Sequence, residues 1–67
     1  MKKAIREYAE NLIREYGDAA YQKAQEAARN AHRRRNARLQ HFLEQVATEI
    51  AKRARVELDQ SSRNYAS

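Results

Sequence analysis

Two helical patterns meet at residues 29–38, which read Arg-Asn-Ala-His-Arg-Arg-Arg-Asn-Ala-Arg. We call this stretch the basic turn, because it holds five arginines and no acidic residue. The net charge of the 67-residue chain is +5, and bases and acids balance in the residues before and after the basic turn. The whole excess of positive charge therefore lies at one place, where the apolar pattern also thins out.

The composition predicts an all-α protein with a single domain. The chain has one glycine, no proline and no cysteine, and it is rich in alanine, arginine, glutamate and glutamine. These residues favour helices, and the length allows one domain at most. A chain of this size buries a small core, and without cysteine no disulfide can stabilise it. We therefore expect a homodimer that completes the core as a helical bundle.

The first predicted helix covers residues 2–16, where apolar residues recur at steps of three and four. Its apolar stripe consists of Ile5, Tyr8, Ala9, Leu12, Ile13 and Tyr16. The two tyrosines are expected to pack in the core or at an interface. Gly17 is expected to end the helix in the left-handed conformation, and Asp18 to cap the next helix.

Two further helices are predicted over residues 19–34 and 37–58, the second of them capped by Asn36. The stripe of residues 19–34 consists of Ala20, Ala24, Ala27, Ala28 and Ala31, with Tyr21 at its edge. The stripe of residues 37–58 consists of Leu39, Phe42, Leu43, Val46, Ala47, Ile50 and Ala54. An alanine stripe allows another helix to approach closely, so the fold expected is a short helix followed by a helical hairpin.

The last two stripes are nearly in phase, so residues 19–58 could instead form one long helix and an extended dimer. We favour a break near residues 34–36, because residues 32–38 contain no large apolar side chain and Arg35 would fall on the core face. Residues 1–58 then form the domain. The polar residues 59–67 lack periodicity and are expected to be a disordered tail.

A resemblance covers about residues 17–50. The run Gly17-Asp18-Ala19-Ala20, the alanines that follow it, and Phe42 with the later Val46-Ala47 and Ile50 resemble short uncharacterised helical proteins of proteobacteria. The chain departs from them at Arg35-Asn36, where they often have a Gly-Asp turn, and at Leu43, where they often have tryptophan. The group has no established activity, so the resemblance implies a helical fold and no functional residue.

The basic turn supports two alternatives. Arginine forks match phosphate geometry, so the cluster could bind nucleic acid or another polyanion. The residues of this candidate site are Arg29, Arg33, Arg34, Arg35 and Arg38. Alternatively, the arginines are structural and bind helix C-terminal carbonyls or acids of a second subunit. We favour this second reading, in which the protein is a small helical interaction or accessory protein, and keep nucleic-acid binding through the basic turn as the alternative.

We expect self-association through the large apolar residues of the third helix, which are Leu39, Phe42, Leu43, Val46 and Ile50.

Catalytic, cofactor and metal sites find little support in the sequence. No catalytic constellation, phosphate-binding loop or cofactor motif is present, so no enzyme is predicted. His32 and His41 lie nine residues apart, unlike helical metal ligands, which are three or four apart. Without a membrane span or signal peptide, a cytoplasmic location is expected.

Overall fold

The computed structural model describes the backbone of residues 2–66 and the side chains of residues 2–54. The helices are α1 (Lys2–Tyr16), the 3-10 turn η1 (Gly17–Ala19), α2 (Ala20–Arg33) and α3 (Ala37–Ala66). The all-α prediction is confirmed. The turn η1 joins α1 to α2 directly, whereas residues 34–36 between α2 and α3 are not helical. The alternative of one helix over residues 19–58 is therefore wrong.

The corner between α1 and α2 is made by Gly17, which has φ +55° as the sequence predicted. A left-handed residue stops the helix, and glycine adopts that conformation without the steric cost of a Cβ. The expected cap by Asp18 is not formed. Asp18 lies inside η1, and α2 begins after Ala19 without a side-chain cap. Because the 3-10 turn runs directly into α2, the first backbone amides of α2 need no side-chain acceptor.

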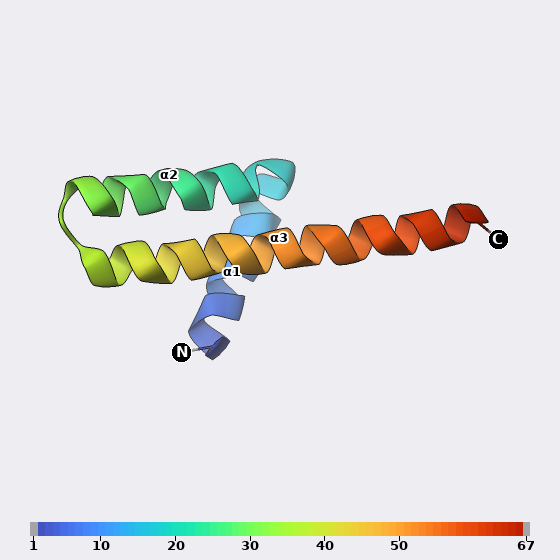
Figure 1. The fold of residues 1–67 in the computed structure, drawn as a ribbon, viewed down its shortest axis with the longest axis horizontal. Helices are drawn as coiled ribbons and strands as arrows, with labels where there is room; N and C mark the ends of the chain where they lie inside the picture. The colour runs from blue at the N-terminus through green and yellow to red at the C-terminus, as the bar shows by residue number, and fades with distance from the viewer. Residues whose placement is uncertain (1, 67) are drawn as a thin grey trace.

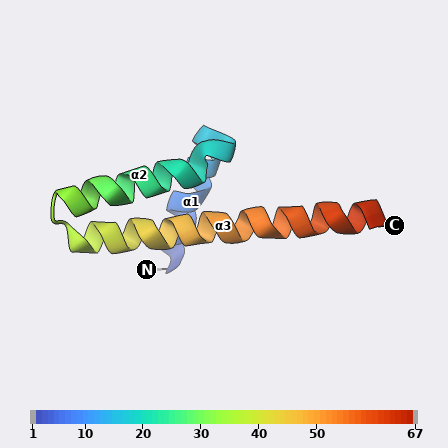
Figure 2. The same cartoon turned by 45° about the horizontal axis from the view of Figure 1, so that its top comes forward.

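Helices α2 and α3 form an antiparallel hairpin and lie side by side, while α1 crosses α3 steeply (Figures 1 and 2). The buried residues of α2 are all alanines from the predicted stripe, namely Ala20, Ala24, Ala28 and Ala31. They pack against the larger buried residues of α3, which are Leu43, Val46 and Ile50. Small residues on one helix and branched residues on the other fill the seam without strain.

The described side chains form two core clusters. At the crossing of all three helices, Ala9, Ala20 and Ala24 pack with Val46, Ala47 and Ile50, and Ile5, Leu12 and Ile13 of α1 cover them. Nearer the basic turn, Ala28 and Ala31 pack with Leu43. Phe42 touches both clusters but is only partly buried. Val46 is the largest side chain that is completely buried, so the core is made mostly of small residues.

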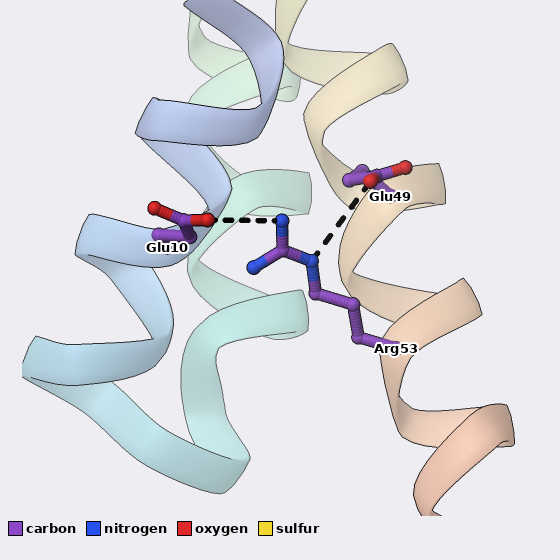
Figure 3. Close-up of polar contacts among 3 residues, drawn as sticks. All are labelled: Glu10, Glu49 and Arg53. Carbon is purple, nitrogen blue, oxygen red and sulfur yellow. Dashed lines mark hydrogen bonds and ion pairs between the residues drawn. The ribbon is translucent and has the colours of Figure 1, made fainter. Parts of the chain in front are cut away.

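Arg53 ties α1 to α3 by charge (Figure 3). Its Nη2 lies 3.3 Å from Oε1 of Glu10 on α1, and its Nε lies 3.8 Å from Oε1 of Glu49 one turn earlier on α3. Glu49 and Arg53 lie four residues apart, the spacing at which opposite charges meet on one face of a helix. All three side chains are partly exposed, so each pair stabilises the fold by at most about 1 kcal/mol. The contact therefore contributes little to the stability of the packing between α1 and α3.

The predicted end of the last helix at Leu58 is wrong, since α3 continues to Ala66 and includes most of the stretch 59–67 expected to be a tail. No proline or glycine interrupts that stretch, so nothing in its backbone chemistry stops a helix that has already begun. The later part of α3 extends past the corner between α1 and α2 (Figure 1), and the molecule is 50 Å long. None of the described helices combines the length and apolar character needed to cross a bilayer.

The close approach of α2 to α3 predicts a strong size limit at Ala24, which is completely buried. Replacing Ala24 with leucine should lower the free energy of unfolding by about 1–3 kcal/mol, because the added atoms must push the helices apart. Urea denaturation followed by circular dichroism measures the change. The control Gln22→Leu adds leucine at an exposed position of the same helix and should change stability by less than about 0.5 kcal/mol. Equal stabilities of the two variants would contradict the packing described.

Candidate functional site at the basic turn

The basic turn reverses the chain through a Schellman motif, in which backbone groups close the end of α2. The amide of Asn36 donates to the carbonyl of Ala31 at 2.9 Å, and the amide of Arg35 donates to the carbonyl of His32 at 3.0 Å. Arg35 itself has φ +59°. Glycine usually occupies this left-handed position, and another residue costs about 1–2 kcal/mol there. The turn therefore keeps a charged residue at a conformational cost.

Asn36 begins α3 as the sequence predicted. Its Oδ1 accepts a hydrogen bond from the amide of Leu39 at 3.2 Å, and its carbonyl accepts one from the amide of Gln40 at 3.0 Å. An asparagine in this position satisfies a backbone donor that the first turn of a helix otherwise leaves without a partner. Asn36 therefore takes part both in the C-terminal cap of α2, through its amide, and in the N-terminal cap of α3, through its side chain.

All five arginines of the basic turn are exposed. Among the side chains that the structure describes, none of these arginines is within ion-pair distance of an acid or hydrogen-bonded to a carbonyl. The carbonyls of Asn30, Ala31 and His32 are instead bonded to backbone amides of the turn. The expectation that the arginines bind these carbonyls is therefore not met within the chain.

The break changes which arginines share a surface. Arg29 and Arg33 lie four residues apart on α2, a spacing that places them on a common face. Arg34 follows α2 and Arg38 lies on α3, so these two are not neighbours on one helix. The charge is consequently distributed over the end of the hairpin, with Arg29 and Arg33 on α2, Arg34 and Arg35 in the turn and Arg38 on α3.

An open groove of about 580 Å³ follows the seam between α2 and α3 next to the basic turn. We call it the α2–α3 groove. Its α2 side is lined by Tyr21, Gln25, Ala28, Arg29, His32 and Arg33, and its α3 side by Gln40, Glu44, Ala47 and Thr48. Its two alanines, Ala28 and Ala47, make its floor apolar. The α2 positions recur at helical steps, so they form one continuous wall.

Hydrogen bonds hold the polar walls of the groove in place. Nδ1 of His32 lies 3.1 Å from Oε1 of Gln40, and Nε2 of Gln40 donates to Oε1 of Glu44 at 2.9 Å. At the far end, Nε2 of Gln25 donates to the hydroxyl oxygen of Tyr21 at 3.0 Å. Of these three contacts, the one between His32 and Gln40 joins α2 to α3 across the seam, and the other two each lie within one helix.

The structure separates the residues expected to mediate self-association. Leu43, Val46 and Ile50 are buried against α1 and α2, so they belong to the core of the single chain and not to a free face. Their spacing in the sequence places them on one apolar face of a helix, but only the positions of α1 and α2 show what covers that face. Leu39 is 43% exposed, and Phe42 is partly buried beneath Tyr8, with ring centroids 5.7 Å apart in an edge-to-face arrangement.

Several features of the site were absent from the sequence prediction. The groove and the role of Tyr21 in it depend on how α2 lies against α3, although Gln25 four residues later is a local signal for the Tyr21 hydrogen bond. The two histidines point to separate partners, His32 to Gln40 and His41 to Gln45. Within the described side chains, no group of three metal-ligating residues comes together.

In comparisons with known proteins, no protein-family model, curated protein or solved structure matches this chain. The resemblance to short proteobacterial proteins therefore stays a prediction.

The cap at Asn36 predicts a stability effect with a matched control. Asn36→Ala removes the acceptor for the Leu39 amide and should lower the free energy of unfolding by about 1 kcal/mol. Asn30→Ala removes an asparagine from the exposed interior of α2, where alanine is the better helix former, and should be neutral or slightly stabilising. Thermal and urea melts of both variants measure the effect. A loss of the same size in both would show that the Asn36 cap does not hold the turn.

Proposed function

We propose that this chain is a small helical binding protein without catalytic activity, acting as an interaction or accessory protein, and that the basic turn is its binding surface. The ligand proposed is a polyanion, with the phosphates of nucleic acid as the leading candidate. A cytoplasmic location, where such polyanions are plentiful, is part of the proposal. Arginine suits this role because its planar fork of donors matches phosphate geometry and keeps its charge at any physiological pH.

One observation carries the proposal. The turn is closed by backbone hydrogen bonds and by Asn36, and no described arginine side chain takes part in closing it. Five exposed arginines at one end of a small hairpin repel one another unless a partner neutralises them. Their presence there, including Arg35 in a conformation that disfavours it, is explained if an external anion is that partner.

The balance of charge elsewhere adds support. Outside the basic turn the bases and acids are equal in number, and described pairs such as Glu10 with Arg53 and Lys23 with Glu26 neutralise each other locally. A polyanion is therefore attracted to one end of the molecule and not to the surface as a whole. The positive field of that end also speeds encounter with the ligand at low salt.

The proposal predicts strongly salt-dependent binding of duplex DNA or RNA. Replacing Arg33, Arg34, Arg35 and Arg38 with glutamine should abolish binding, while the helical circular dichroism signal stays unchanged. For the parent protein, log K should fall linearly with log salt, with a slope of about −0.9 for each phosphate neutralised on B-DNA. Fluorescence anisotropy of labelled nucleic acid over a salt series measures both quantities.

A matched control separates local charge from total charge. Replacing Lys2, Lys3, Arg6 and Arg14 with glutamine removes four positive charges from α1 and should leave most of the affinity. Equal losses in the two quadruple variants would show that net charge alone drives binding. No binding by the parent protein at about 50 mM salt, where the electrostatic term is strong, would refute the proposal.

Self-association is a second candidate, supported by the small core and by the exposed Leu39. Among the side chains of residues 2–54, the buried ones are mostly alanines, which contribute little burial each. A second copy that covers Tyr8, Leu39 and Phe42 would add apolar contact next to the existing core. The same contact would place two basic turns in one particle and strengthen binding to a long polyanion.

Sedimentation equilibrium tests this second candidate directly. The parent protein should give about twice the 7.9 kDa chain mass at micromolar concentration, and Leu39→Glu should shift it toward the monomer because a charge cannot be buried unpaired. Gln22→Glu, on the exposed face of α2, should leave the mass unchanged. A monomeric parent protein, or a dimer that Leu39→Glu leaves intact, would contradict association through this face.

A further inference from the structure

The α2–α3 groove gives the polyanion site a direction. Tyr21 lines one end of it and Arg33 the other, and at 1.5 Å per residue the α2 wall between them is about 18 Å long. The groove leads along the seam of the hairpin into the basic turn, so a ligand bound at the arginines can continue along it. We propose that the α2–α3 groove binds single-stranded nucleic acid, an inference that rests on the proposed function.

The end nearest the basic turn is suited to phosphate. Arg29 and Arg33 both line the groove, and their positions are separated by about 6 Å along the helix axis. Two guanidinium groups at that separation can bind neighbouring phosphates of one strand. Exposed arginines bind phosphate with little loss of hydration, because guanidinium is weakly hydrated.

The opposite end is suited to a base. Tyr21 is 41% exposed, and its hydroxyl oxygen accepts a hydrogen bond from Gln25. Aromatic rings placed beside a cationic surface are the usual stacking platforms of proteins that bind single strands, since every base has a face that can stack. The sequence does not place Tyr21 among the arginines, but the helix brings it to the same groove.

The middle of the groove favours this orientation. Glu44 lies on the α3 wall between the two ends, and its carboxylate is held by Gln40. A phosphate next to Glu44 is repelled, whereas a base amino group can donate a hydrogen bond to it. Charge therefore directs the phosphates toward Arg29 and Arg33 and leaves the remaining length for bases.

The residues and the open shape of the groove suit a single strand better than a duplex, an acidic peptide or a small ligand. A duplex keeps its bases paired inside, so it can use the arginines but not the ring of Tyr21. An acidic peptide can pair with the arginines, yet it is repelled by Glu44 and has no planar group for the tyrosine. The groove is also open along its length, unlike the enclosed sites that bury most of a small ligand.

Fluorescence anisotropy with a labelled oligothymidylate of about 12 nucleotides tests the inference, since this length falls within the usual range of single-strand sites. A duplex of the same length and a glutamate peptide of the same charge serve as competitors. The single strand should bind more tightly than the duplex, and the peptide should compete poorly. Stronger binding of the duplex, or efficient competition by the peptide, would overturn the assignment.

Variants of the tyrosines locate the stacking site. Tyr21→Leu should weaken single-strand binding by at least about fivefold and leave duplex binding unchanged, because one base–aromatic stack is lost. Tyr21→Phe keeps the ring and should retain binding. Tyr16→Leu alters a similarly exposed tyrosine that does not line the groove and should have no effect. Binding that is unchanged in Tyr21→Leu would show that the groove is not the path of the strand.

Variants of the arginines give an independent measurement. The double variant Arg29→Gln/Arg33→Gln should reduce the magnitude of the salt slope by about 1.4 on a single strand, at about 0.7 for each phosphate contact. Arg34→Gln/Arg38→Gln removes the same charge outside the groove and should reduce it less. Equal effects of the two pairs, with duplex and single strand bound alike, would refute the groove while leaving the proposed function intact. Absence of binding to every polyanion would refute both.

Discussion

The structure depends on the close packing of α2 against α3. Every buried residue of α2 is alanine, so α3 can approach closely and pack its branched side chains against these alanines. Alanine also has the highest helix propensity, which stabilises a helix of only 14 residues before it has a partner. The same choice leaves little apolar area to bury. A chain organised in this way gains rigidity from helix propensity and backbone proximity more than from a large core.

This packing determines where charge can lie. The buried residues that α2 and α3 bring together are all apolar, and the five arginines that interrupt the apolar pattern are all exposed. The turn closes by main-chain hydrogen bonds, which require no particular side chain apart from Asn36. The side chains of these arginines therefore remain exposed to solvent. The α2–α3 groove, with its alanine floor, continues this exposed surface along the hairpin.

Helix α1 has a different role. It crosses α3 near Val46 and Ile50, and its apolar residues cover the end of the core farthest from the basic turn. Its contact with α3 is completed by Arg53, which reaches Glu10 on one side and Glu49 on the other (Figure 3). The long separation of Glu10 and Arg53 in the sequence conceals this pair, whereas the local pair of Arg53 with Glu49 follows from helical spacing.

The sequence by itself determined the all-α class, the corner at Gly17, the alanine face of α2 and the break before Asn36. Each of these depends on local chemistry: propensity, a left-handed glycine, periodicity or a cap. Tertiary structure decided the rest, because burial depends on which faces meet. It placed Leu43, Val46 and Ile50 in the core and left Leu39 exposed. It also left Asp18 without a capping role and brought Tyr21 to the groove that contains Arg29. Periodicity identifies an apolar face, but only the path of the neighbouring helices shows whether that face is covered.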